Sequence, residues 1–141
     1  MEYRRFERTL VVRLDPKEEI LLSLIELCRK ENIKLASVTG LGAVDEVYLG
    51  VFDTEEKKYY SKEFKGLYEI ASLMGSISEK DGDPYLHLHM VIGNPISGEC
   101  HSGHLSRGVV SATAEIIITE IDGAVGRIEN EEIGLNLFKF N

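Results

Sequence analysis

The sequence has few cysteines, no long apolar run and no apolar leader, and each of these shortages excludes a class of protein. Only two cysteines, Cys28 and Cys100, occur in 141 residues, which is too few for a disulfide framework, so we expect reduced thiols. No apolar run approaches the roughly 20 residues that a membrane span requires, so no membrane association is predicted. The charged residues from Met1 to Arg8 do not resemble a secretory signal, and we expect a cytoplasmic protein.

Basic residues are also in short supply, and this bears on nucleic-acid binding. The chain has 16 Lys and Arg residues against 24 Asp and Glu residues, which gives a formal net charge of −8. General binding to nucleic acid depends on Lys and Arg side chains that neutralise phosphates, so the chain as a whole is unsuited to it. Arg4, Arg5, Arg8 and Arg13 are the best candidates for a local basic patch, and the alternative is solvent-facing charge on an edge strand.

Linkers, internal repeats and low-complexity tracts are absent, and the chain length then limits the fold. A chain of 141 residues suits one hydrophobic core, and no Gly/Ser-rich or Pro-rich stretch separates two domains. Phosphate-binding glycine motifs and serine or cysteine nucleophile motifs do not occur either. We therefore predict a single domain over residues 1–141.

One helix is predicted, and it lies near the N-terminus. Residues 3–14 alternate as a strand does, and the strand is expected to end at Asp15. Asp15 is a good N-cap, Pro16 fits the first helical position, and Glu18 lies three residues after the cap. A broad apolar face follows, so we expect a helix that ends near Asn32.

The rest of the chain is predicted to form mainly strands. Gly40-Leu41-Gly42 indicates a tight bend or a close backbone approach, residues 79–84 a hairpin connection and residues 129–132 a solvated turn. One helix followed by many strands predicts an α+β fold, in which the helix packs on a mostly antiparallel sheet. The expected strands run from Lys34 to Thr39, Val44 to Phe52, Lys57 to Phe64, Leu67 to Ser78, Tyr85 to Ile92, Gly108 to Ile121 and Leu135 to Phe140.

All four histidines lie close together, between positions 87 and 104. In the expected strand, His87 and His89 point to the same face because successive side chains alternate. Their Cα atoms would lie about 6.6 Å apart. From that separation two imidazole nitrogens can converge on one metal ion.

A third imidazole can reach this pair from the next segment. Residues 93–104 are rich in Gly, Pro and Ser, and we expect a loop that folds back and delivers His104. Together with His87 and His89 it would form an open site, with a fourth position for water or substrate. Zinc is the first choice, and imidazole also suits nickel, cobalt and copper. The alternative is two strand histidines that are hydrogen-bonded to backbone or exposed on the wet face of the sheet.

Four further residues allow two interpretations each. Glu115 is a carboxylate in an apolar strand, so it is either a second-sphere partner or general base of the metal site, or a charge on the wet face of an edge strand. Glu69 allows the same two interpretations and is given no catalytic role. His101 and Cys100 either complete the metal sphere or are loop residues without a partner, and both are left out of the ligand set.

Five short motifs resemble those of the PPC (plants and prokaryotes conserved) domain. The resemblance runs over nearly the whole chain. The motifs are Gly40 to Val44, Gly66 to Gly75, Leu86 to His89, Gly103 to Leu105 and Thr113 to Glu115. The resemblance implies an antiparallel sheet flanked by helices and assembly as a homotrimer. It also implies a metal, usually zinc, on the histidines of the family's H-x-H and G-G-H-L motifs, which correspond to His87, His89 and His104.

The resemblance also bears on partners. Plant members join the domain to an AT-hook that enters the DNA minor groove, whereas this chain has no R-G-R-P segment, so DNA binding is expected only by analogy. A family motif that contacts partner proteins, G-R-F-E-I-L, has Leu67 here in place of Arg, and Ser102 replaces a Gly of G-G-H-L without removing His104. The partner-binding candidates are Gly66, Leu67, Tyr68, Glu69 and Ile70.

Two main functions follow from these observations. The first is a trimeric metal-binding protein that acts as a DNA-associated or regulatory module. The second is a zinc-dependent hydrolase of a small substrate, in which the metal activates water and Glu115 or Glu69 handles the proton. In a third, the metal only pins the histidine strand to the segment that follows it.

Overall fold

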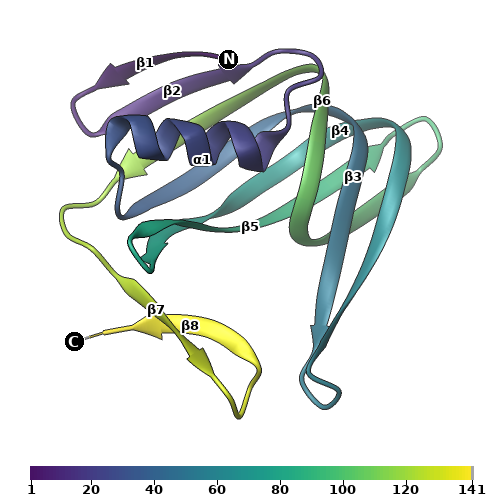
Figure 1. Cartoon of the computed structure of the whole chain (residues 1–141). Coiled ribbons are helices and arrows are strands. Elements are labelled where there is room, and N and C mark those ends of the chain that lie inside the picture. The colour runs from purple at the N-terminus through teal and green to yellow at the C-terminus, as the bar shows by residue number, and fades with distance from the viewer. Residues whose placement is uncertain (141) are drawn as a thin grey trace.

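The computed structural model describes residues 1–140, which form one helix and eight strands (Figure 1). The helix, α1, spans Ile20–Glu31. The strands are β1 (Glu2–Phe6), β2 (Thr9–Leu14), β3 (Ala36–Asp53), β4 (Lys58–Lys80), β5 (Asp83–Asn94), β6 (Glu99–Glu120), β7 (Gly126–Asn130) and β8 (Leu135–Lys139). All strand pairings are antiparallel except the single contact of β4 with β7. The predicted α+β class is confirmed.

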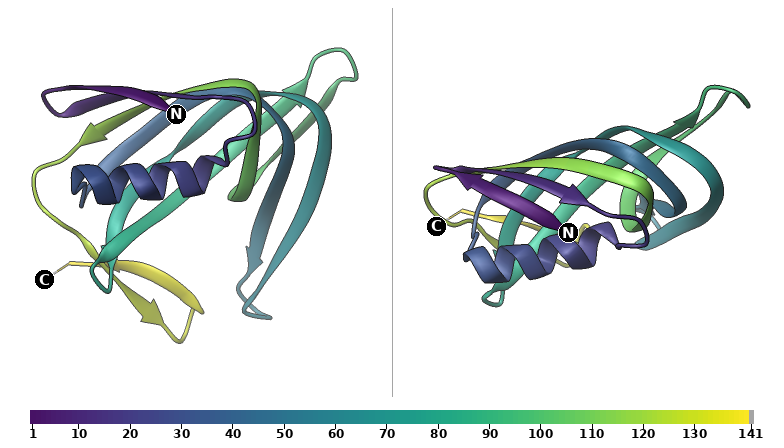
Figure 2. Two further views of the ribbon diagram at one scale, coloured as in Figure 1. Left: turned by 45° about the horizontal axis from the view of Figure 1, so that its top comes forward. Right: turned by 90° about the horizontal axis from the view of Figure 1, so that it is seen from above.

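The four long strands pair in a closed cycle. The strand order is β1-β2-β6-β3-β4-β7-β8, and β5 joins β4 to β6. As Figure 2 shows, these strands curl, and α1 lies across one face of the sheet, where it packs on β5 and β6. The fully buried side chains fill the space between helix and sheet, and they include Leu10, Leu14, Leu24, Leu27, Ile77, Leu88, Met90, Ile92 and Ile118.

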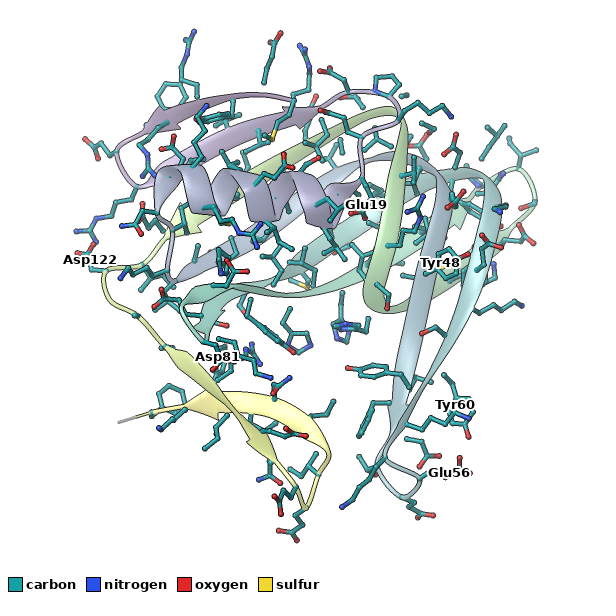
Figure 3. All side chains as sticks on the ribbon, in the orientation of Figure 1. Glu19, Tyr48, Glu56, Tyr60, Asp81 and Asp122 are labelled. Carbon is teal, nitrogen blue, oxygen red and sulfur yellow. The ribbon has the colours of Figure 1, made fainter. Side chains whose placement is uncertain are left out.

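The helix begins four residues later than predicted. Lys17 N–H donates to the carbonyl of Val110, and Val110 N–H donates to the carbonyl of Glu18, so this segment pairs with β6 before it can coil. Glu19 is therefore the N-cap, and its carboxylate accepts from Leu22 N–H at 2.8 Å (Figure 3). The buried residues Ile20, Leu24, Leu27 and Cys28 recur at helical spacing and form the packed face.

The N-terminal segment is two strands rather than one. A turn at Glu7, whose φ is 52°, separates β1 from β2, and β2 then pairs with β6. Its arginines do not form a free basic patch. Arg5 bonds to Glu31 and Glu120, and Arg8 and Arg13 also form ion pairs with carboxylates.

Two breaks that were predicted between strands, near Gly40-Leu41-Gly42 and at Gly66, lie inside continuous strands. β3 passes through Gly40 and Gly42 with a bulge in its pairing to β4, and β4 likewise runs through Gly66. A Cβ on Gly42 would lie 2.3 Å from the carbonyl oxygen of Thr113, so the glycine is required by close strand approach. Of the two predictions for Gly40-Leu41-Gly42, the close backbone approach is confirmed and the tight bend is wrong.

The segment expected to be a loop, residues 93–104, is mostly strand. The chain turns at residues 95–98 and β6 begins at Glu99, so Cys100 lies in a strand. The hairpin at Asp81-Gly82 is confirmed, with positive φ at both residues. Strand β7 was not predicted; it pairs with β8 as a hairpin across the residue 131–134 turn.

Within residues 1–140, no helix has the length and apolar character needed to cross a membrane.

Candidate metal centre

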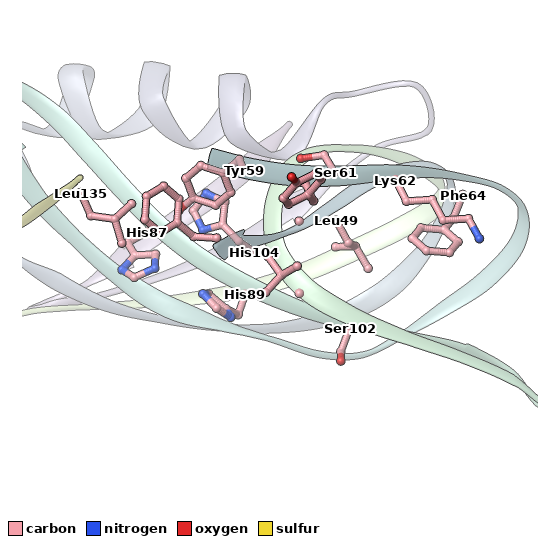
Figure 4. Close-up of a pocket in the computed structure, with 15 residues that line it drawn as sticks. Leu49, Tyr59, Ser61, Lys62, Phe64, His87, His89, Ser102, His104 and Leu135 are labelled. Atoms are coloured by element: carbon pink, nitrogen blue, oxygen red, sulfur yellow. The ribbon is translucent and has the colours of Figure 1, made fainter. Parts of the chain in front are cut away.

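Three histidines from two neighbouring strands converge on one point. His89 of β5 lies directly opposite His104 of β6, and His87 is two residues along β5 on the same face. One ligand atom from each residue lies within 4.8 Å of the corresponding atoms of the other two. The ring centroids are 5.2–5.6 Å apart, and Figure 4 shows the imidazoles turned toward one another.

Alternation along both strands explains which histidines meet. The buried residues Leu88 and Met90 hold one face of β5 in the core, which leaves His87 and His89 on the other face. On β6, His101 is three residues from His104 and so points to the opposite side, where its ring stacks on Phe64 at 4.1 Å. The structure brings the three predicted histidines together, and His104 lies on a strand rather than on a loop.

Two glycines allow the strands to approach closely enough. A Cβ on Gly75 of β4 would lie 2.0 Å from the carbonyl oxygen of His87, and one on Gly103 would lie 2.7 Å from that of Gly50. Ser102, which replaces a family glycine, has an exposed side chain and is accommodated without such a clash.

The protonation states favour metal binding. Burial, followed by the charges of His87 and His89, lowers the pKa of His104 to about 4. Burial also lowers the pKa of His87, with smaller contributions from the charges of Arg127 and His89. Both imidazoles are therefore neutral at physiological pH and have a free lone pair.

The geometry also fits a metal ion. Nδ1 of His104 is buried and has no hydrogen-bond partner among residues 1–140. Nitrogen ligands lie about 2.0–2.1 Å from zinc. Small side-chain rotations bring three donor atoms that already lie within 4.8 Å of one another to that distance. The donor set is all nitrogen, which zinc, nickel, cobalt and copper accept.

The cluster opens into a hollow of about 580 Å³ that is lined mainly by apolar groups. The β3–β4 hairpin forms one wall with Phe52, Tyr59 and Tyr60. Figure 4 shows Tyr59 beside the histidines. The ring of Tyr59 lies 5.3 Å from that of His104, and burial raises the pKa of Tyr59. Tyr59 had no distinguishing signal in the sequence, because a wall residue is recognised only once the hairpin is placed.

A second, smaller hollow of about 260 Å³ lies beside the cluster, and the β7–β8 hairpin lines it. Arg127 of β7 lines it together with His87 and His104. Its guanidinium packs over Tyr85 at 4.6 Å and over Phe138 at 4.2 Å. Burial lowers the pKa of Arg127, whose Nη2 is buried without a hydrogen-bond partner among residues 1–140. Sequence patterns gave no reason to connect this residue with the histidines.

The two glutamates considered as proton acceptors lie elsewhere. Glu115 is exposed on β6 and lines a separate hollow with Tyr3, Arg4 and Leu41, away from the three histidines. Glu69 is exposed on β4 opposite Ala43 and lines none of these hollows. Cys100 is an exposed free thiol that lines neither hollow beside the histidines. The geometry supports no role for the glutamates in the cluster.

The partner-binding candidates from Gly66 to Ile70 lie on β4 with mixed exposure. Tyr68 and Ile70 are buried, and the Tyr68 hydroxyl donates to Glu99 at 3.2 Å. Leu67 is 78% exposed, and its carbonyl accepts from Asn94. Only the outward-facing residues of this motif are accessible to another molecule, and Leu67 is the largest apolar one.

Several solved structures share this fold over almost their whole length. A plant- and prokaryote-conserved (PPC) protein of Pyrococcus horikoshii is 35% identical, with a TM-score of 0.87 and coverage of 99% of this chain and 94% of that one. A metal-containing protein of Archaeoglobus fulgidus is 30% identical, with a TM-score of 0.87 and coverage of 99% and 97%. A "putative DNA binding protein" of Bacteroides thetaiotaomicron is 29% identical, with a TM-score of 0.94 and coverage of 99% and 96%.

A family model gives the same result from the sequence side. Residues 1–122 match the Plants and Prokaryotes Conserved (PCC) domain, the family abbreviated PPC above. The match includes all three clustered histidines and stops before the β7–β8 hairpin. A search of curated proteins gave no match. The chain belongs to the Plants and Prokaryotes Conserved domain family.

Proposed function

We propose that this protein binds one divalent transition metal per chain, zinc in the first place, on His87, His89 and His104. The observation that carries the proposal is the convergence of three donor atoms within 4.8 Å on two paired strands. The buried, unpartnered Nδ1 of His104 and the lowered pKa values of His87 and His104 support it. The description of the Archaeoglobus relative as metal-containing agrees with it.

The surroundings favour ligand binding over hydrolysis. His87, His89 and His104 would hold the zinc ion, which would supply Lewis acidity toward an oxygen of a bound ligand. Hydrolysis also needs a group to take up a proton, and no carboxylate among residues 1–140 lines either hollow beside the histidines. The zinc-dependent hydrolase is the second candidate, and the exposed side chain of His89 in a 580 Å³ hollow is what favours it.

Assembly as a homotrimer and association with DNA are further parts of the proposal. Exposed apolar side chains of Phe6, Val11 and Leu41 line a hollow of about 780 Å³ on the outer sheet face, which suits contact with further copies. Leu41→Glu should then dissociate the assembly in light scattering. DNA association is proposed from relatives described as "putative" DNA-binding proteins, the Bacteroides structure among them. Ion-paired arginines and a net charge of −8 predict weak binding that salt abolishes. A cytoplasmic location is proposed with it.

Zinc titration tests the metal proposal with a matched control inside the chain. Isothermal titration of metal-free protein with Zn²⁺ should give one site per chain. His89→Ala should abolish that site, and His101→Ala should leave it unchanged, because His101 stacks on Phe64 outside the cluster. Equal loss of zinc binding in both variants, or no zinc site in the wild type, would contradict the proposal.

A further inference from the structure

Arg127 differs from the other arginines of the chain in how its charge is compensated. Five of the seven arginines form an ion pair with a carboxylate, and Arg4 is exposed to solvent. Arg127 is half-buried and has no carboxylate within ion-pair distance among residues 1–140. In a chain with eight more acidic than basic residues (24 against 16), a shielded cation without an acidic partner needs an explanation.

The contacts of Arg127 hold its side chain but do not neutralise it. Its Nε donates to Ser78 Oγ at 2.9 Å and its Nη1 donates to the carbonyl of Asn136 at 2.9 Å. The guanidinium also lies over the rings of Tyr85 and Phe138. Nη2 alone is left, buried and without a partner among residues 1–140. Contacts from β4, β5 and β8 fix the orientation of the side chain, and the two N–H donors of Nη2 stay unpartnered.

Arg127, which carries this unpartnered donor, lines the same hollow as two of the proposed metal ligands. His87 and His104 line the 260 Å³ hollow together with Arg127, and the remaining lining is mostly aromatic and aliphatic, from Tyr59, Tyr85, Leu135, Leu137 and Phe138. The volume suits a molecule of a few heavy atoms. An apolar wall with one fixed cation at its edge is complementary to a small organic molecule that carries a single negative charge.

We propose that Arg127 is the anion anchor of the histidine site and that the ligand is a small monocarboxylate with an apolar body. The Nη2 group of the guanidinium can donate to one oxygen of a carboxylate, and the aromatic and aliphatic wall packs against the apolar body of the ligand. A phosphate group fits less well, because it needs several donors and only one nitrogen of the guanidinium is unpartnered. This inference rests on the proposed function, since the bound carboxylate lies beside the metal ligands.

The β7–β8 hairpin would then be the element that defines the ligand. It contributes Arg127, Leu135, Leu137 and Phe138 to the hollow, and it lies outside the residues that match the family model. Its attachment to the rest of the sheet is narrow, with a single pairing of Gly126 with Glu79 and the Arg127 bond to Ser78. His87, His89 and His104 thus lie within the residues that match the family model, and Arg127 lies on the hairpin that follows them, which the matches to solved relatives also cover.

Binding of butyrate to the zinc-loaded protein tests the proposal, with butyramide as the uncharged analogue of the same shape. Calorimetry should show saturable binding of butyrate, at least about tenfold weaker binding of butyramide, and a loss of at least tenfold for butyrate in Arg127→Met, as expected for removal of a charged hydrogen-bond donor. Arg107→Met is the matched control, because that arginine pairs with Glu46 on the surface, outside both hollows. It should bind butyrate like the wild type.

Two further measurements separate the possible failures. Zinc content is measured on every sample, so a protein without zinc reports failure of the metal proposal, whereas a zinc-loaded protein that binds no butyrate reports failure of this one. Arg127→Lys keeps a positive charge at this position, so it should still bind butyrate more tightly than butyramide even if Arg127→Met is destabilised. Unchanged butyrate affinity in a folded Arg127→Met, or tighter binding of inorganic phosphate than of butyrate, would overturn the proposal.

Discussion

The two ends of the sheet handle polar groups in opposite ways. Where β1, β2 and α1 meet, Arg5 is held between Glu31 and Glu120, at 2.9 and 2.6 Å. At the histidine end, His104 Nδ1 and Arg127 Nη2 are the two buried side-chain nitrogen or oxygen atoms within residues 1–140 that have no partner. Unsatisfied buried groups cost stability, so their concentration beside one hollow indicates a surface that is completed by a ligand. Under the proposed function, the charged groups at the first end stabilise the fold and those at the second end bind a ligand.

The largest expected effect is the difference in stability loss between substitutions on the two faces of β5. Leu88 is fully buried, so Leu88→Ala should lower the free energy of unfolding by about 2–5 kcal/mol. His89, its neighbour, has an exposed side chain, so His89→Ala should change the stability of metal-free protein by only about 0.5 kcal/mol. Urea denaturation of both variants in chelator measures the difference. Comparable losses would show that the histidine face is part of the core.

Metal removal should affect the histidine end only. With free zinc at 100 times its dissociation constant, binding stabilises the folded state by about 2.7 kcal/mol. Chelation should remove this amount from the wild type and nothing from His104→Ala. Thermal unfolding with and without chelator provides the measurement, and Arg5→Met, altered at the opposite end, should respond to chelator like the wild type. A chelator effect that persists in His104→Ala would place the metal elsewhere.

The ion-paired end should instead respond to acid. Hydrogen bonds from Tyr3 and Arg5 lower the pKa of Glu31 below its usual value of 4.5. A carboxylate with a lowered folded-state pKa stabilises the fold above its unfolded pKa, and this contribution is lost as the pH falls through the folded value. In metal-free protein, stability should therefore fall more steeply below pH 4.5 for the wild type than for Glu31→Gln. The free energy of unfolding is measured by denaturant titration at each pH. If it falls with pH equally in the wild type and in Glu31→Gln, the stabilising role of Glu31 is contradicted.

The smallest effect concerns the two thiols and leaves stability unchanged. Burial raises the pKa of Cys28 to about 12, whereas Cys100 is exposed on β6. Iodoacetamide should modify Cys100 in the folded protein and reach Cys28 only after unfolding, because the thiolate is the reactive form. Mass spectrometry after timed alkylation measures the two rates. Equal rates would mean that α1 opens readily from the sheet.

The sequence was most informative where one local rule decides the structure. Alternation along β5 predicted that His87 and His89 share a face, and burial of Leu88 and Met90 on the other face agrees. The α+β class followed in the same way, because one segment has the apolar spacing of a helix and many segments alternate as strands do. The helix start was wrong because Lys17 pairs with Val110, a contact between residues 93 positions apart that no local pattern encodes.

The missed parts of the candidate site share that cause. Gly, Ser and Pro around His101 favoured a loop, yet β6 extends to Glu99 because β5 is there to pair with it. Arg127 and Tyr59 reach the histidines from hairpins distant in sequence, so only the assembled sheet connects them. Glu115 was considered because a carboxylate in an apolar strand is unusual, and its place on the outer face explains that pattern without the metal.

The central claim is that His87, His89 and His104 together hold one metal ion. Crystals of zinc-loaded protein, measured on both sides of the zinc absorption edge, test it by locating the ion directly. The structure predicts one anomalous peak per chain, with a nitrogen of each of the three histidines about 2.0–2.1 Å away. A peak at Cys100 or His101, or no peak between β5 and β6 in protein shown to contain zinc, would contradict it.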